Sequence, residues 1–155
     1  MPKPDRNNFA VFLYALILAV VGVLMQLAFQ FTAAVPVDAA LAVLMTLAFF
    51  VGPLELAGCG ALAYVLLAWR PSPSPELALF VGFPIAFYFI RQVLPWRPLA
   101  LSAAAVVAGI GAFYLLLDYR TARAHLPELA LSAAIGICIA LAAYTYMKRM
   151  TGTKT

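Results

Sequence analysis

The feature that most limits how this chain can fold is a long apolar segment, Ala39–Trp69, which carries a single charged residue, Glu55. A helix crosses the hydrocarbon core of a bilayer, roughly 30 Å thick, with about 20 residues, and this segment is about half as long again. Gly52-Pro53 lies near its middle and favours a turn, because proline lacks an amide hydrogen and glycine tolerates turn dihedrals. The segment therefore predicts two consecutive helices that reverse direction at Gly52-Pro53.

The overall composition is that of a membrane protein. Hydrophobic residues make up 66% of the chain and charged residues 10%, and the mean hydropathy is +1.00. A soluble domain averages about 45–50% apolar and about 25% charged residues. A soluble protein of 155 residues has no interior large enough to bury this much apolar surface, so lipid is expected to solvate much of it.

The other apolar runs are separated by short polar or proline-rich connections such as Arg70–Glu76. This pattern predicts an all-α polytopic membrane protein, a six-helix transmembrane bundle that forms one integral membrane domain over residues 1–155. The first run is longer than the roughly 7–15 apolar residues of a secretory signal peptide, so it is expected to be an uncleaved span. The expected spans cover about residues 9–29, 36–51, 54–69, 77–94, 99–117 and 129–147.

The distribution of lysine and arginine favours six spans over five. With six spans and a cytoplasmic N-terminus, the cytoplasmic side holds most of the cationic residues, as the positive-inside rule requires. With Ala39–Trp69 as one long tilted span, the cations divide equally between the two sides. The sequence thus predicts a multi-pass protein of the bacterial cytoplasmic (inner) membrane with both termini in the cytoplasm. The cytoplasmic residues would be Lys3, Arg6, Arg91, Arg97, Lys148, Arg149 and Lys154, and the outer ones Arg70, Arg120 and Arg123.

No catalytic, cofactor or metal site is predicted. Cys59 and Cys138 lie inside apolar runs, where cysteine usually packs as a small hydrophobe, and His125 is the single histidine. The sequence contains no nucleophile motif, phosphate-binding glycine loop or carboxylate pair at metal-ligand spacing. The net charge is +4, but the lysine and arginine residues are scattered between apolar runs, which is not the pattern of a nucleic-acid-binding protein. We therefore expect no enzyme activity and no nucleic-acid partner.

Two charged residues in apolar surroundings are candidates for an intramembrane polar pair. A carboxylate deep in a bilayer is costly and is a functional hypothesis by default, which makes Glu55 the first candidate. Alternatively, Glu55 lies in water in the first turn of a helix, where the helix dipole favours an acid. Arg91 either extends to the interface or pairs with an acid, Glu55 or Asp118. The six-span topology places Arg91 and Glu55 on the same side, so Glu55 is the expected partner.

Small residues at helical spacing are the candidates for close helix packing. In lipid, small side chains let two helix backbones approach each other, and this drives association. The stripes serve either packing within the bundle or the docking of a partner's transmembrane helix. They consist of Gly58 and Gly60 in the third expected span, Ala105 and Gly109 in the fifth, and Ser132, Gly136 and Ala140 in the sixth.

A set of motifs follows the first expected span: Pro36-Val37-Asp38 before the leucine-rich run Ala39–Phe50, then Gly52-Pro53-Leu54, and then Gly58 and Gly60. Together with six short expected spans, this pattern resembles the MreD family of rod-shape-determining membrane proteins. Members of that family usually carry an aspartate at the end of the third span and a Pro-x-Gly entry to the fourth, where this chain has Trp69-Arg70 and Pro71–Glu76.

The resemblance implies a non-catalytic scaffold of the bacterial cell-elongation machinery, which maintains cell shape and directs peptidoglycan synthesis. Besides membrane lipid, its implied partners are a single-span MreC-like protein and the MreB-type filament system. The lipid-II polymerase RodA and its partner transpeptidase would be further neighbours. The mechanism would be helix packing that holds a periplasmic partner to a cytoplasmic filament.

Two alternatives stay open. The same family is similar in fold to the substrate-binding components of energy-coupling-factor transporters, which line an outward pocket with polar and aromatic side chains. The outer loops of this chain offer Gln30, Arg120, Arg123 and His125 for that role. The third class is an accessory subunit of another membrane complex, which would rely on the same helix packing as a scaffold.

Overall fold

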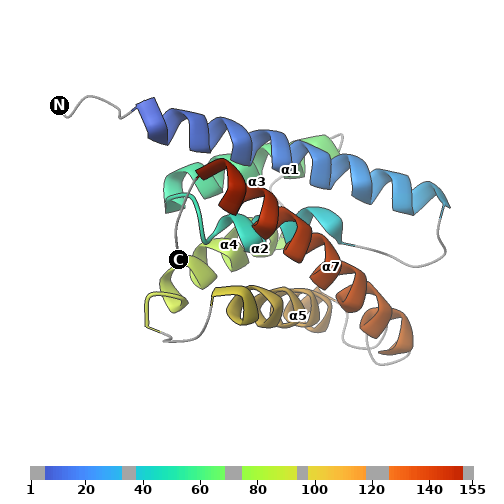
Figure 1. Ribbon diagram of the computed structural model, residues 1–155. Coiled ribbons are helices and arrows are strands. Elements are labelled where there is room, and N and C mark those ends of the chain that lie inside the picture. The colour runs from blue at the N-terminus through green and yellow to red at the C-terminus, as the bar shows by residue number, and fades with distance from the viewer. Residues whose placement is uncertain (1–5, 33–37, 69–74, 94–97, 118–125, 152–155) are drawn as a thin grey trace.

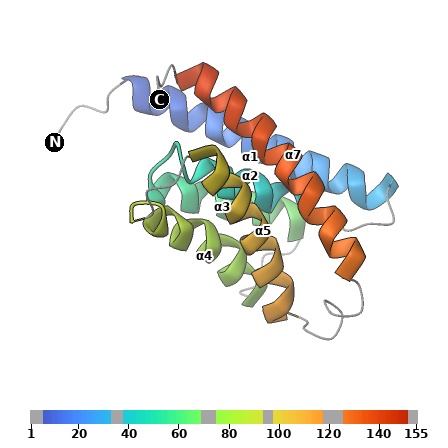
Figure 2. The same ribbon diagram turned by 60° about the horizontal axis from the view of Figure 1, so that its bottom comes forward.

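The computed structural model describes residues 6–32, 38–68, 75–93, 98–117 and 126–151, and within these ranges the chain forms helices and no strand. The expectation of an all-α protein is confirmed. Several helices pass side by side through the molecule in both directions (Figures 1 and 2). In chain order they are α1 (Arg6–Thr32), α2 (Ala39–Leu47), α3 (Pro53–Ala68), α4 (Pro75–Ile90), α5 (Pro98–Leu117) and α7 (Leu126–Thr151).

Among the described helices, α2 is the shortest and forms the centre of the bundle. All nine of its residues are buried, and it packs against each of the other five described helices. Its sequence, AALAVLMTL, is apolar on almost every side, and a helix that is hydrophobic all round is either buried in protein or surrounded by lipid. The hydrophobic core of the molecule is therefore built around α2.

Small residues on the surrounding helices allow them to approach α2 closely. Gly22 of α1 is buried against it, and a Cβ atom at this position would lie 3.0 Å from Cγ2 of Val43. A side chain larger than hydrogen at Gly22 would therefore push α1 away from the central helix.

Polar contacts fix the two ends of α2 in the apolar core. At its start, Oε1 of the buried Gln26 in α1 accepts a hydrogen bond from the Ala40 backbone N–H at 3.1 Å. Near its end, the Thr46 hydroxyl donates to the Ala42 carbonyl at 2.9 Å and lies 3.4 Å from the Ser102 hydroxyl of α5. These groups satisfy polar atoms that have no access to water.

The chain reverses direction between α2 and α3, as the Gly52-Pro53 pair predicted. After Leu47 the backbone tightens, because the amides of Phe49 and Phe50 donate to carbonyls only three residues earlier, at 3.1 and 2.9 Å. Helix α3 then starts at Pro53. Figure 1 shows α2 and α3 running in opposite directions from this turn.

The expected second span, residues 36–51, is not confirmed as a membrane crossing. Its helix has nine residues and reaches only about 14 Å at ~1.5 Å per residue, less than half of the hydrocarbon core. In the turn that follows the helix, the ring of Phe49 packs against Phe87 and the ring of Phe50 packs against Tyr144. The apolar character of this segment reflects burial by other helices and not contact with lipid.

Within the residues that the structure describes, two helical segments are long and apolar enough to cross a membrane, Phe9–Phe31 in α1 and Ala130–Met150 in α7. A bundle of six crossings is therefore not confirmed. The shorter apolar helical segments are Pro53–Leu67, Leu79–Ile90 and Ala100–Ala112.

The outside of α1 is an apolar stripe. Five large side chains at helical spacing are each more than two-fifths exposed, and such a continuous apolar face is what contact with lipid requires. Figure 1 shows that α1 begins and α7 ends at the same end of the bundle. The exposed residues are Phe9, Leu13, Ile17, Val21 and Leu24.

Candidate functional site

The small-residue stripe of α7 faces the inside of the bundle. Ser132, Gly136 and Ala140 are all buried. A Cβ atom at Gly136 would lie 3.0 Å from Cδ1 of Ile110 and 3.1 Å from Cγ1 of Val106, both on α5. The stripe therefore packs α7 against α5, and within the described part of the chain it serves the fold.

The small residues of α5, and one of the two in α3, also serve internal packing. Ala105 is buried, and a Cβ atom at Gly109 would meet Cε of Met45 on α2 at 3.0 Å. A Cβ atom at Gly60 would lie 3.3 Å from Cγ2 of Val81, so Gly60 lies where α3 packs on α4.

Gly58 differs from the other candidate glycines because it faces outward. It is exposed, and a Cβ atom added there would meet nothing within 4 Å. It belongs to a line of exposed residues on α3 that recur at intervals of four, three and four. This line, the outer seam of α3, consists of Leu54, Gly58, Ala61 and Val65.

The outer seam of α3 has the pattern of a helix-packing surface. Its spacing is that of the contact positions in left-handed helix pairs. Gly58 and Ala61 leave a shallow place in its middle, between Leu54, which is 83% exposed, and Val65, which is 47% exposed. A second helix that crossed at Gly58 would come close to the α3 backbone and would contact larger side chains above and below it.

Glu55 lies in the first turn of α3 and is exposed. One of its carboxylate oxygens lies against Gly52, the residue before the helix, so closely that a Cβ atom at position 52 would collide with it. An acid at this place interacts favourably with the positive end of the helix dipole. Glu55 is therefore a first-turn acid of α3 at the end of the bundle.

Arg91 directly follows α4 and is half-buried. Its guanidinium carbon lies 4.5 Å from the centroid of the Tyr88 ring and 5.8 Å from that of Phe49. Both distances are within the range of a cation–π interaction, which is about 6 Å. Aromatic rings therefore hold this cation in place.

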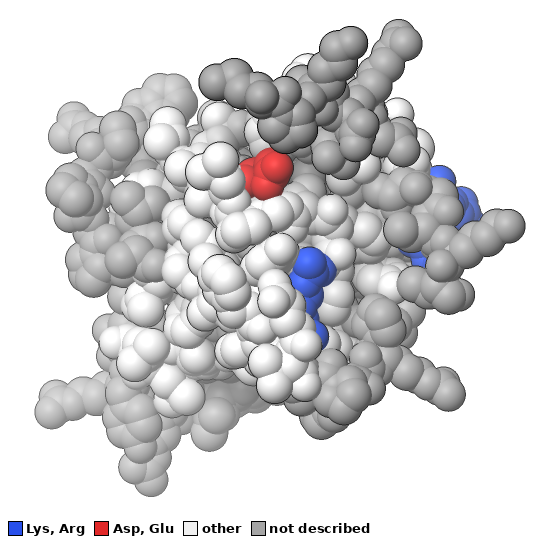
Figure 3. All heavy atoms as spheres, turned by 90° about the vertical axis from the view of Figure 1, so that its left-hand side faces the viewer, with Lys and Arg blue, Asp and Glu red and all other residues white. Residues whose placement is uncertain are grey.

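Glu55 and Arg91 lie at the same end of the bundle, where α3 begins and α4 ends (Figure 1). Acidic and basic side chains lie apart on this end face (Figure 3). Within the described residues no ion pair joins the two side chains, and the ring contacts occupy Arg91 instead. The geometry brings them to one surface but not into contact.

A small cleft of about 170 Å³ lies beside Glu55, between the start of α1 and the turn after α2. In the described ranges, no group of three or more histidine, cysteine, aspartate or glutamate residues could hold a metal ion there or elsewhere. Both cysteines are free, Cys59 buried and Cys138 exposed. Arg120, Arg123 and His125, the outer-loop candidates for a ligand site, lie outside the described residues.

Sequence reasoning missed an alanine-lined groove between α4 and α5. The residues on its α5 wall that repeat every four positions are Ala104, Ala108 and Ala112. This spacing was available as a signal, but so many apolar residues surround it that the sequence does not show which face of α5 lies open. The comparison with known proteins adds no further assignment: no family model, curated protein or solved structure matches this chain.

Proposed function

We propose that this chain is a non-catalytic integral membrane scaffold of the bacterial cell-elongation machinery, which binds a partner's transmembrane helix along the outer seam of α3. The observation that carries the proposal is the open space at Gly58 in a line of exposed residues. The resemblance to the MreD family gives the proposed partners, a single-span MreC-like protein and, through it, the MreB-type filament system.

The physics of helix association in lipid supports this role for Gly58. Lipid tails are as apolar as leucine, so a transmembrane helix gains little by burying large apolar side chains against another helix. It gains from close backbone contact, which requires glycine or alanine on the outside of the scaffold. Among the glycine candidates of the described bundle, Gly60, Gly109 and Gly136 are used internally, and Gly58 is open.

The proposal is tested by purification of the full chain in mild detergent from a rod-shaped bacterium that expresses it. The wild type should retain a single-span membrane protein of the elongation machinery. Gly58→Leu should reduce the recovery of this partner by about tenfold or more, because a leucine side chain holds the helices apart. The bundle itself should keep its thermal stability, since nothing lies within 4 Å of the new Cβ atom.

Gly111→Leu is the matched control, because a Cβ atom at Gly111 also meets nothing within 4 Å but projects from α5. Equal loss of the partner from both variants would contradict docking at the α3 seam. Recovery of no elongation protein by the wild type would contradict the cell-shape role itself. Recovery of a pair of ATPase subunits, or of a bound vitamin, would assign the chain to transport instead.

A further inference from the structure

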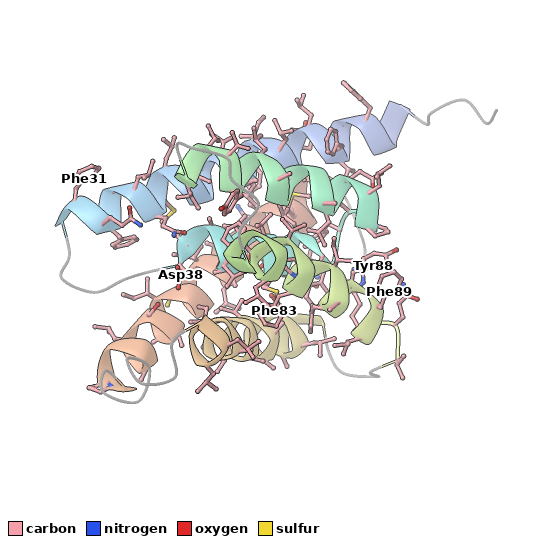
Figure 4. All side chains as sticks on the ribbon, turned by 180° about the vertical axis from the view of Figure 1, so that it is seen from behind. Phe31, Asp38, Phe83, Tyr88 and Phe89 are labelled. Atoms are coloured by element: carbon pink, nitrogen blue, oxygen red, sulfur yellow. The ribbon has the colours of Figure 1, made fainter. Side chains whose placement is uncertain are left out.

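An apolar groove of about 360 Å³ runs between α4 and α5. Phe83 and Phe87 form its α4 wall, Met45 of α2 lies at its base, and Ala104 and Ala108 belong to the α5 wall. Figure 4, seen from behind, shows Phe83 on the side of α4 that faces α5. The volume is within the range of small-molecule sites, roughly 300–1,000 Å³.

The groove exists because α5 presents alanines where larger side chains would have filled the space. An unfilled apolar gap loses the dispersion contacts that close packing provides. In a membrane, the molecules available to fill it are lipid chains and the helices of other proteins. The residues at the ends of the groove therefore indicate which of these molecules it binds.

A fixed positive charge lies at one end of the groove. Phe87 and Ile90 line the groove at the end of α4, and Arg91 is the next residue along the chain. The guanidinium contacts the face of Phe49, and the Phe49 ring in turn packs 5.5 Å from that of Phe87, measured between centroids. The cation is thus held directly beside the apolar wall.

Among the described residues, Arg91 is held by aromatic rings, which leave its hydrogen-bonding groups available. A ring face attracts the guanidinium through its π electrons and accepts no conventional hydrogen bond from the N–H groups at its edge. No carboxylate in the described residues forms an ion pair with Arg91. Guanidinium groups bind phosphate with two parallel hydrogen bonds.

We propose that the α4–α5 groove binds an acyl chain of an anionic phospholipid from the surrounding bilayer, with the lipid phosphate at Arg91. The molecule matches the site at both ends, an apolar chain against the alanine-lined groove and a negative group against a cation. The fixed charge of Arg91 favours an anionic lipid over a zwitterionic one. The inference rests on the proposed membrane location and is independent of the scaffold role.

The test uses the purified full chain in detergent, titrated with phosphatidylglycerol or with phosphatidylcholine of identical acyl chains, with thermal unfolding as the measurement. Phosphatidylglycerol should stabilise the wild type at concentrations about tenfold lower than phosphatidylcholine, as expected for a hydrogen-bonded charge pair. Arg91→Gln should abolish this preference, and Arg91→Lys should keep part of it. Arg149→Gln, which removes an exposed cation of α7, should keep the preference in full.

The groove itself is tested with Ala108→Leu, which should weaken the binding of both lipids by filling the space for the chain. Ala134→Leu, at an exposed alanine of α7, is its control and should bind lipid as the wild type does. Equal stabilisation of the wild type by the two lipids would overturn the proposal, and so would equal effects of Arg91→Gln and Arg149→Gln. Unchanged lipid binding in Ala108→Leu together with loss of a co-purifying membrane protein would show that the groove holds a helix. Because the lipid titration uses the purified chain alone, its failure is distinct from failure of the scaffold role.

Discussion

Gln26 of α1 provides the hydrogen-bond acceptor for the Ala40 amide at the start of α2, at 3.1 Å. The first amides of a helix have no partner within the helix, and a preceding side chain usually supplies one. Asp38 occupies that position in α2, but its side chain makes no capping bond to the helix. The side-chain amide of Gln26 instead contacts both Ala40 and Asp38, because its Nε2 atom also lies 3.5 Å from Oδ1 of Asp38. A residue fourteen positions before Ala40 thus caps the central helix.

Replacing Gln26 with leucine should destabilise the bundle by about 1–3 kcal/mol, the cost of a buried backbone amide left without an acceptor. The two side chains are similar in size, so little of the effect would come from packing. The measurement is the free energy of unfolding in detergent. Gln30→Leu, at an exposed glutamine of the same helix, is the control and should unfold as the wild type does. Equal stability of both variants would contradict the capping role.

Gly136→Leu should damage the fold itself. Its Cβ atom would lie at most 3.1 Å from side-chain atoms of both Ile110 and Val106, and inserting further carbon atoms into a packed core costs about 1–3 kcal/mol or more. We expect a lower unfolding temperature and loss of well-dispersed NMR signals. Gly58→Leu, which adds the same side chain to an open surface, should show neither effect. A Gly136→Leu protein as stable as the wild type would mean that α7 does not pack against α5 through this residue.

Ser132→Ala should preserve or raise stability, although it removes a polar group. The Ser132 side chain is buried, and its hydroxyl oxygen has no hydrogen-bond partner in the described part of the chain. Burying an unpaired hydroxyl costs free energy that alanine does not incur. Thermal unfolding of the two proteins in the same detergent decides the point. A clear loss of stability would show that the hydroxyl is bonded in the membrane.

Glu55→Gln should change stability very little. The carboxylate is exposed at the start of α3, where it gains only a modest interaction with the helix dipole. A large loss of stability would instead identify a buried carboxylate with a charged partner. Unfolding at low and high salt provides a second measurement, because any small effect of an exposed charge should shrink as salt screens it.

Reporter domains fused to the two ends of the chain should lie in the same compartment. Helix α1 begins and helix α7 ends at one end of the bundle (Figure 1), and the cations of the sequence favour the cytoplasm for that end. A fluorescent protein that folds only in the cytoplasm and an enzyme that is active only outside it provide complementary signals. Ends on opposite sides of the membrane would exclude the arrangement.

The sequence by itself was sufficient for the helical class, the interruption at Gly52-Pro53 and most helix positions. Proline and glycine act through local backbone geometry, so α3 begins at Pro53, where they predict it. The expected spans at 54–69 and 99–117 differ from α3 and α5 by only one residue at any end. Local chemistry decides where such helices begin and end, whatever surrounds them.

Only the tertiary structure decided which apolar surfaces face inward. Gly58 and Gly60 are two residues apart and equally apolar in sequence, yet one is open and the other packs on Val81. The sequence of helix α2 predicts a membrane span, but the helix is covered by other helices of the protein. In a soluble protein, polarity separates the outside of a helix from the inside. Where lipid is the solvent, both sides of a helix are apolar, so the pattern of hydrophobic residues does not show which side faces inward. Only packing against neighbouring helices decides this.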